Sequence, residues 1–190
     1  MLLLVGLGNP GSNYTNTRHN IGFKIIDAIN AHFKLSKQKP KFKGLLTTGN
    51  IDEKKIYAIK PLTFMNNSGT AIKELIDYFK IDAKDVFVFH DDMDIDFGKI
   101  KAKFGGSSAG HNGIESIDKF IGKDYSRVRI GIGHPEQKKK VNNHVLEDFK
   151  EDEEEKINDI TGNIVKQLPT LIEKKIDLFS SKVNQDLNGI

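Results

Sequence analysis

The alternation of apolar runs with amphipathic segments is the feature that most limits what this chain can fold into. Short apolar runs typical of buried strands recur between stretches in which apolar residues return every three or four positions, as on one face of a helix. The predicted strands cover residues 2–7, 45–51, 55–59, 86–90, 100–104 and 127–132. The predicted helices cover residues 18–33, 71–80 and 112–121. Strands separated by helices indicate an α/β fold, in which helices flank a mostly parallel sheet.

A hairpin makes the expected sheet mixed. Residues 45–51 and 55–59 flank Asp52-Glu53, so these two strands should pair antiparallel, and the hairpin should end at Pro61. A sheet that contains one hairpin among strands joined by helices is mixed but mostly parallel.

The last third of the chain is predicted to be helical. Apolar positions with helical spacing run through residues 151–166, and Pro169 should interrupt this helix before another short one, because proline lacks the N–H group that a helix interior uses. The sequence contains neither an internal repeat nor a low-complexity linker. We therefore expect a single domain over residues 1–190, with residues 150–190 forming a C-terminal helical segment packed on it.

The composition excludes several classes of protein. A chain of 190 residues can bury a substantial core, and the absence of cysteine excludes disulfides, thiolate metal sites and cysteine nucleophiles. No apolar run approaches the roughly 20 residues of a membrane-spanning helix, and the first residues do not resemble a signal peptide. We expect a cytoplasmic protein with no membrane partner.

Basic residues are only slightly in excess, since the formal net charge is +3. This excess does not by itself identify a nucleic-acid-binding protein. The lysines gather in clusters within residues 34–43 and 138–140, and an acidic run follows at residues 147–155. Either lysine cluster fits a solvated surface and a contact with phosphates equally well.

The first loop, Gly6-Leu7-Gly8-Asn9-Pro10-Gly11, matches the G-x-G-x-x-G pattern of dinucleotide-binding proteins. In those proteins the glycines open a helix whose free N–H groups bind the pyrophosphate, and an acidic residue follows a second strand about 20 residues later. Here the helical pattern begins several residues late, Pro10 has no N–H group, and Asp27 falls inside the predicted helix. A nicotinamide-dependent enzyme is therefore a distant alternative.

Patterns typical of metal sites are weak. The carboxylates of residues 92–96 alternate as in a calcium-binding loop, but Phe97 and Lys103 occupy the positions where that loop needs glycine and glutamate. The six histidines show no H-E-x-x-H or other strong metal-ligand spacing. The residues themselves therefore give no support for a metal.

Histidine and carboxylate chemistry on water is the simplest enzyme chemistry open to this chain, which lacks cysteine. His19 lies at the start of a helix beside the glycine-rich loop. Asp91 lies where a strand leaves the sheet, the usual place for ligand sites in α/β folds. Taken alone, a histidine at the start of a helix is more often a surface or capping residue than a catalytic one.

Three asparagines, Asn9, Asn66 and Asn112, lie in or beside loops. An amide donates and accepts hydrogen bonds at the same time, so these side chains could orient a peptide. They could equally well form local turn bonds, and for Asn9 and Asn66 taken separately this is the simpler interpretation.

Five motifs, in the same order along the chain, resemble those of bacterial peptidyl-tRNA hydrolase. They are residues 6–14 with Thr17-Arg18-His19-Asn20, Pro61-Leu62-Thr63-Phe64-Met65-Asn66, His90-Asp91-Asp92-Met93-Asp94, Gly110-His111-Asn112-Gly113 and Arg129-Ile130-Gly131-Ile132-Gly133-His134-Pro135. The resemblance covers nearly the whole chain, and only the C-terminal tail is weakly diagnostic.

This resemblance implies a single α/β domain, usually monomeric, that hydrolyses the ester joining a stalled peptide to the terminal ribose of tRNA and so recycles the tRNA. It implies peptidyl-tRNA as the partner, and neither a metal nor an organic cofactor. By its place in the motifs, His19 resembles the general base and Asp91 the carboxylate that keeps it in its basic form. Asn9 resembles the residue that helps to distinguish blocked from free aminoacyl-tRNA.

The resemblance also implies substrate contacts. The matching positions are Tyr14, Phe64, Met65, Asn66, His111 and Asn112. Among them, Asn66 and Asn112 match the amides that hold the peptide backbone. Tyr14 and Phe64 match aromatic residues that contact the substrate. Lys103 and Arg129 match a basic pair that binds the 5′-phosphate of tRNA, which suits charge-assisted hydrogen bonds.

The segment before His111 departs from the family pattern, because it reads Ser107-Ser108-Ala109 where many members carry more glycine. Serine and alanine reach positive φ less readily than glycine, so we expect a stiffer loop over residues 105–110. The main alternative to an enzyme is a non-catalytic RNA-binding module on the same fold, because one fold can serve several functions.

Overall fold

The computed structural model describes residues 1–135 and 141–187, and a seven-stranded sheet forms its centre. The strands are β1 (Leu2–Gly6), β2 (Lys39–Lys41), β3 (Gly44–Ile51), β4 (Lys54–Pro61), β5 (Val86–Asp92), β6 (Ile100–Phe104) and β7 (Ser126–Gly131). Their order across the sheet is β2-β3-β4-β1-β5-β7-β6. Strands β4, β1, β5 and β7 are parallel, while β2, β3 and β6 pair antiparallel with their neighbours, which confirms the predicted mixed sheet.

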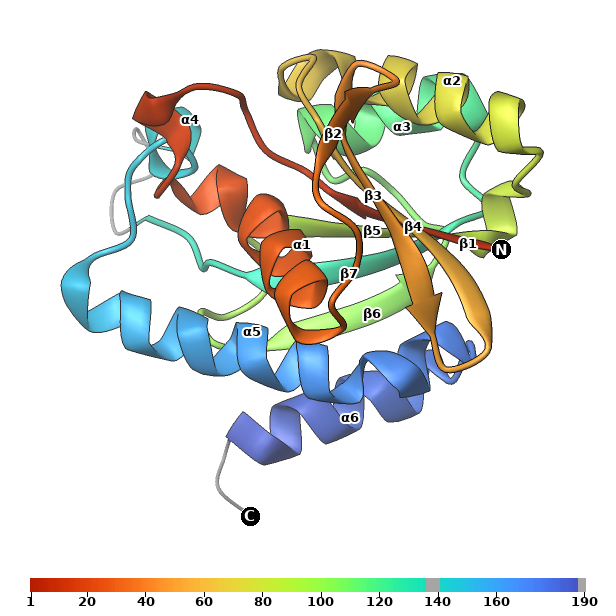
Figure 1. The fold of residues 1–190 in the computed structure, drawn as a ribbon. Helices are drawn as coiled ribbons and strands as arrows, with labels where there is room; N and C mark the ends of the chain where they lie inside the picture. The colour runs from red at the N-terminus through yellow and green to blue at the C-terminus, as the bar shows by residue number, and fades with distance from the viewer. Residues whose placement is uncertain (136–140, 188–190) are drawn as a thin grey trace.

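Helices cover both faces of this sheet (Figure 1). They are α1 (Ile21–His32), α2 (Ser68–Phe79), α3 (Asn112–Ile121), α4 (Val141–His144), α5 (Glu151–Ile172) and α6 (Ile176–Leu187), joined by the 3-10 turns η1 (Ser12–Tyr14), η2 (Arg18–Asn20), η3 (Met65–Asn67) and η4 (Ala83–Asp85). Helices α2 and α3 cover one face, and α1, α5 and α6 cover the other.

Strand β1 shows why its sequence is a continuous apolar run. Successive side chains of a strand point to opposite faces of the sheet. Leu2 and Leu4 therefore enter the core shared with α1, α5 and α6, while Leu3 and Val5 enter the core shared with α2 and α3. A strand that is covered on both faces has no polar positions to alternate with the apolar ones.

The two edges of the sheet are protected in different ways. At one edge, β2 is a short, exposed Lys39-Pro40-Lys41 strand, and its charges and proline discourage further pairing. This strand was not predicted, because three residues around a proline carry little strand signal. At the other edge, α6 lies along β6, and Asn184 both accepts from the Ile100 N–H and donates to the Ile100 carbonyl, each at 3.0 Å.

The expectation that Pro169 interrupts the long C-terminal helix is wrong. Helix α5 continues through Pro169 and ends at Ile172. A proline removes one hydrogen bond of the helix, but Leu168, Leu171 and Ile172 are fully buried in the core, and their packing offsets that loss. The following helix, α6, then begins at Ile176.

The first helix begins at Ile21, later than predicted, because residues 18–20 form the separate turn η2. The other end of the prediction agrees with α1, which ends at His32. The second lysine cluster, residues 138–140, lies outside the described residues. Within the described part of the chain, no helix combines the length and the apolar character needed to cross a membrane.

Candidate active site

A cleft of about 520 Å³ opens beyond the carboxyl ends of β1, β4 and β5. This is the edge of an α/β sheet where ligands usually bind. Of the residues singled out from the sequence, it brings together Asn9, His19, Phe64, Met65, Asn66, Asp91, His111 and Asn112. Tyr14, Lys103 and Arg129 do not line it.

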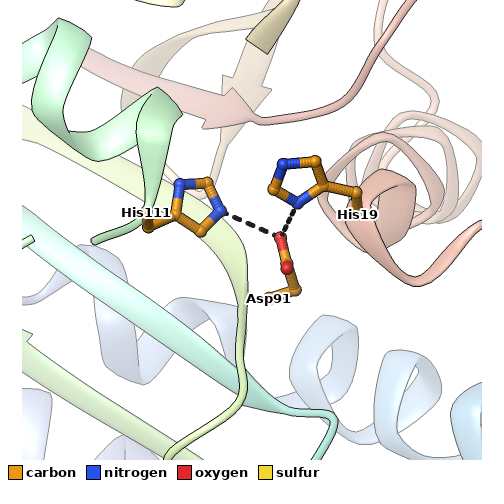
Figure 2. A group of neighbouring side chains, drawn as sticks. All are labelled: His19, Asp91 and His111. Atoms are coloured by element: carbon orange, nitrogen blue, oxygen red, sulfur yellow. Dashed lines mark hydrogen bonds and ion pairs between the residues drawn. The ribbon is translucent and has the colours of Figure 1, made fainter. Parts of the chain in front are cut away.

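His19 and Asp91 both line this cleft and form a buried pair, whose contact is drawn in Figure 2. Turn η2 carries His19, and Asp91 is the penultimate residue of β5; their side chains come together from different elements. The His19 Nδ1–H donates to Asp91 Oδ1 at 2.8 Å, and the two residues are 7% and 2% exposed. Because Nδ1 carries the proton, Nε2 of neutral His19 is an acceptor.

His111 contacts the same carboxylate oxygen from the opposite side (Figure 2). It is the N-cap of α3, and its Nδ1 accepts from the backbone N–H groups of Gly113 and Ile114 at 3.1 and 3.3 Å. In neutral His111 the proton must therefore sit on Nε2, which donates to Asp91 Oδ1 at 2.9 Å. Both nitrogens of His111 are thus occupied.

These contacts determine the charge of Asp91. Burial alone would raise the pKa of its carboxyl group, but the charges and hydrogen bonds of His19 and His111 outweigh burial and hold the pKa well below its usual value. Asp91 is therefore ionised throughout the neutral range, and it can stabilise a positive charge that forms on His19.

The same three side chains are close enough together to be considered as ligands of a metal ion. One ligand atom each from His19, Asp91 and His111 lies within 4.8 Å of the others. A metal on His111 Nε2 would require the ring proton to move to Nδ1, where it would face the N–H groups of Gly113 and Ile114. Histidine ligands normally donate this second N–H to an acceptor. The donor set therefore suits a hydrogen-bonded network better than a metal.

Asn9 is held rigidly beside this network. Its backbone N–H donates to Asn20 Oδ1 at 2.8 Å, and its carbonyl accepts from Asn20 Nδ2 at 2.9 Å. Its own Oδ1 accepts from the Met65 N–H at 2.8 Å. The acceptor of the Asn9 amide is thereby used within the protein, and a ligand in the cleft meets its donor, Nδ2.

Asn66 and Asn112 lie on other walls of the cleft, at η3 and at the first turn of α3, and both are exposed. Phe64 is 52% exposed and stands at a positive φ of 58°, an unusual backbone conformation for a bulky residue. Its ring meets the edge of Tyr14 with the centroids 6.5 Å apart. Tyr14 therefore borders the cleft through Phe64.

Lys103 and Arg129 lie on the neighbouring strands β6 and β7, outside the cleft. Arg129 Nε donates to Asp92 Oδ2 at 2.7 Å, and Lys103 is exposed. Lys103 stands opposite Arg127, whose guanidinium is buried and donates to the Ser107 carbonyl and to Asp118, each at 2.8 Å. The two predicted phosphate ligands thus form a diagonal pair on one face of the sheet.

The loop over residues 105–110 has positive φ at Gly105, Gly106, Ala109 and Gly110. Ala109 adopts φ 48° although it is not glycine, which costs conformational energy. The expected stiffness of the loop stays a prediction, and the bond from Arg127 to the Ser107 carbonyl is one restraint consistent with it.

A wall of the cleft that sequence reasoning missed comes from the segment after α4. Val145 and Leu146 line the cleft, and the Val145 carbonyl accepts from the His19 N–H at 2.9 Å. Arg18 is buried and donates to the His144 carbonyl and to Glu153. The sequence gives only two signals of this contact. One is the charged residue Arg18 at the start of a predicted helix, and the other is the acidic run at residues 147–155.

The glycines of the first loop serve close packing. A side chain on Gly6 would overlap the Gly22 carbonyl, and one on Gly8 would overlap the ring of Phe23. The chain then passes through η1 and η2 before α1 begins, so no helix opens at the glycines. This arrangement lacks the helix N-terminus that a dinucleotide pyrophosphate needs.

Comparisons with known proteins point to one family. The family model described as peptidyl-tRNA hydrolase matches residues 3–189. The chain is 72% identical to a peptidyl-tRNA hydrolase from Pelagibacter ubique over 184 residues, 97% of this chain and 99% of that one, and 45% identical to one from Ehrlichia canis, with coverages of 97% and 95%. A crystal structure of peptidyl-tRNA hydrolase from Acinetobacter baumannii superposes with a TM-score of 0.90 at 34% identity, covering 97% of this chain and 94% of that one.

Proposed function

The chain belongs to the peptidyl-tRNA hydrolase family, and we propose that it hydrolyses the ester between peptide and tRNA with His19 as the general base and Asp91 as its support. The chain is accordingly a hydrolase that acts on ester bonds. The roles that we propose for single residues rest on the buried pair of His19 and Asp91 in the cleft. The observation that carries it is the His19 Nδ1–H bond to Asp91, which leaves Nε2 as an acceptor.

The proposed step is direct hydrolysis. His19 Nε2 takes a proton from water as the water oxygen attacks the ester carbonyl, and Asp91 stabilises the resulting imidazolium. The imidazolium then gives this proton to the ribose oxygen as the carbon–oxygen bond of the ester breaks. The products are a peptide carboxylic acid, which ionises by releasing the second proton of the water to solvent, and a tRNA with a free terminal hydroxyl. No covalent enzyme intermediate forms.

Asn9 is proposed to select blocked substrates. Its Oδ1 is already bound to the Met65 N–H, so the amide offers only a donor to the cleft. The carbonyl of a peptide can accept from this donor, whereas the charged ammonium of a free aminoacyl ester is itself a donor and is left poorly solvated. Asn66 and Asn112 are exposed in the cleft, where they can pair with peptide groups.

We propose the remaining roles by analogy with the motifs of the family. Lys103 and Arg129 are proposed to bind the 5′-phosphate of tRNA, since both are cations on one face of the sheet near the cleft. Tyr14 and Phe64 are proposed to contact the substrate through their exposed ring surfaces. We further propose that the chain acts as a monomeric single domain in the cytoplasm, where its substrate is produced.

The test compares catalysis with simple binding. Wild-type protein is mixed with N-acetyl-aminoacyl-tRNA and with unblocked aminoacyl-tRNA, and release of the acyl group and retention of tRNA on a filter are both measured. The proposal predicts rapid release from the blocked substrate and slow release from the free one. Retention of tRNA without release would support an RNA-binding module and contradict the proposed function.

A further inference from the structure

His90 is a buried titratable residue that the mechanism does not use. It precedes Asp91 on β5, and only 3% of it is exposed. Because side chains alternate along a strand, His90 points to the face of the sheet covered by α2 and α3, whereas Asp91 points to the opposite face. A histidine is costly to bury, so its contacts deserve a physical explanation.

Two contacts of the His90 side chain lead to the His19–Asp91–His111 network. Its Nδ1–H donates to the backbone carbonyl of Asp91 at 2.8 Å, which fixes the tautomer. Its ring packs edge-on against His111, with the centroids 4.8 Å apart and the planes at 70°. Its Nε2 is buried and has no hydrogen-bond partner among the described residues. His90 therefore touches Asp91 and one of the two donors that Asp91 binds.

The surroundings keep His90 uncharged. The titratable groups that act on it are His111, Asp91 and the guanidinium of Arg127, and Arg129 lies opposite it on β7. Burial is the main cause that lowers the pKa of His90 to about 3, and His111 and Arg127 act in the same direction, against Asp91. A neutral ring does not compete with His19 for the charge of Asp91, whereas a second imidazolium beside Asp91 would.

We propose that His90 is a positioning residue for the hydrolysis reaction. Its N–H holds the Asp91 peptide group, and its ring supports that of His111, so that Asp91 Oδ1 stays within 2.8 Å of His19 Nδ1. This inference rests on the proposed function, because the step that it affects is proton transfer at His19. In this proposal the buried, neutral His90 orients the carboxylate of Asp91, and Asp91 in turn orients His19.

Two substitutions separate the two contacts. His90→Phe retains a ring against His111 but has no donor for the Asp91 carbonyl, and His90→Asn retains a donor close to the position of Nδ1 but has no ring. A displaced Asp91 stabilises the imidazolium less well. We expect His90→Phe to lower kcat about tenfold while KM changes by less than about twofold. The acid limb of the pH profile of kcat should also move to lower pH, and His90→Asn should recover part of both losses.

Tyr125→Phe provides a matched control. Tyr125 is fully buried in the core shared with α2 and α3, and its hydroxyl donates to Asp118 at 2.8 Å. Like His90→Phe, this variant keeps a ring and removes a buried donor, but Tyr125 directly precedes β7, at the end of the sheet away from Asp91. Tyr125→Phe should therefore lower thermal stability without moving the acid limb. An equal displacement of the acid limb in both phenylalanine variants would contradict a specific role of His90.

A second readout does not depend on turnover. The Nδ1–H proton of His19, bonded to a buried carboxylate, should give a low-field proton NMR signal, and this signal should shift or broaden in His90→Phe. A folded His90→Phe protein with the wild-type kcat, acid limb and NMR signal would overturn the inference. An inactive wild-type protein would instead defeat the proposed function, and the NMR comparison would still decide the positioning role.

Discussion

At the scale of single residues, one carboxylate oxygen gives two similar histidines different chemistry. His19 and His111 both donate to Asp91 Oδ1, but the second nitrogen of His111 is bound to Gly113 and Ile114, whereas Nε2 of His19 is left as an acceptor. The sequence contains both histidines but not this difference, because it depends on two backbone N–H groups at the start of α3. This difference in hydrogen bonding is the reason why we propose His19, and not His111, as the base.

Asn9 offers the sharpest prediction at this scale. Asn9→Asp keeps the acceptor for the Met65 N–H but replaces the donor Nδ2 with a second oxygen. Release from N-acetyl-aminoacyl-tRNA should fall about tenfold or more, because a substrate carbonyl loses its partner, while a free ammonium gains one. The ratio of blocked to unblocked release rates, measured under single-turnover conditions, should therefore shrink.

Asn112→Ala is the companion variant, since it removes an exposed amide from another wall of the cleft. We expect it to slow release from the blocked substrate, because an amide that can pair with peptide groups is lost. Wild-type ratio and rate in both variants would mean that these asparagines are turn residues and that the peptide binds elsewhere.

At the scale of elements, strands and helices with strong periodicity could be predicted, and short elements held by distant contacts could not. The apolar runs of β1 and β5 and the amphipathic faces of α1 and α2 give clear patterns. The sequence predicts η2 as part of the first helix, because residues 18–20 do not interrupt the helical spacing of the apolar residues. The cleft wall at Val145 is invisible locally, because its contact with His19 spans the chain.

The strand pair β6 and β7 carries a prediction about tRNA. Lys103→Ala and Arg129→Ala should weaken hydrolysis of a full tRNA substrate more than that of a peptidyl-nucleotide fragment without the 5′ end, because phosphate contacts position the ligand. The loss should diminish at high salt. Lys73→Ala, on α2, removes a surface cation paired with Asp77 and should leave both substrates unaffected. Equal losses on both substrates would assign the pair a structural role.

The contact of α6 with the edge of β6 carries a stability prediction. Asn184→Ala leaves the N–H and the carbonyl of Ile100 without their side-chain partners. We expect the free energy of unfolding to fall by about 1–3 kcal/mol, because partly buried backbone groups lose hydrogen bonds. Urea unfolding measures this loss, and an exposed control such as Asn50→Ala should show little. An unchanged urea midpoint in Asn184→Ala would show that the N–H and carbonyl of Ile100 find hydrogen-bond partners without the Asn184 side chain.

At the scale of the whole molecule, the two hydrophobic cores meet the cleft from opposite faces of the sheet. Alternation along the sequence predicts the mixed sheet and its two helical layers, and the motif order predicts most of the cleft. Neither pattern predicts that α5 continues through Pro169, because the burial of Leu168 and Leu171 decides that point. Neither predicts that His90 contacts the His19–Asp91–His111 network, because the neighbours of His90 come from other elements. Tertiary contacts therefore supply what the local sequence cannot.

The buried His90 also makes stability depend on pH. The unfolded chain takes up a proton near pH 6.5, whereas the folded protein excludes it until about pH 3, so folding is disfavoured as the pH falls through this interval. The free energy of unfolding should therefore decrease by up to about 1.4 kcal/mol per pH unit from this residue alone. No such contribution exists above pH 6.5. Urea unfolding between pH 7 and pH 5 should show a smaller decrease in His90→Phe, and equal decreases would contradict the explanation.

Steady-state release from N-acetyl-aminoacyl-tRNA by His19→Ala tests the role of His19 most directly. Loss of a general base should lower kcat by roughly 10²–10⁴-fold, while the circular dichroism spectrum and tRNA binding stay those of the wild type. His32→Ala, which alters an exposed histidine at the end of α1, is the matched control and should keep full activity. Near-wild-type turnover by a folded His19→Ala protein would contradict the assignment of His19 as the base.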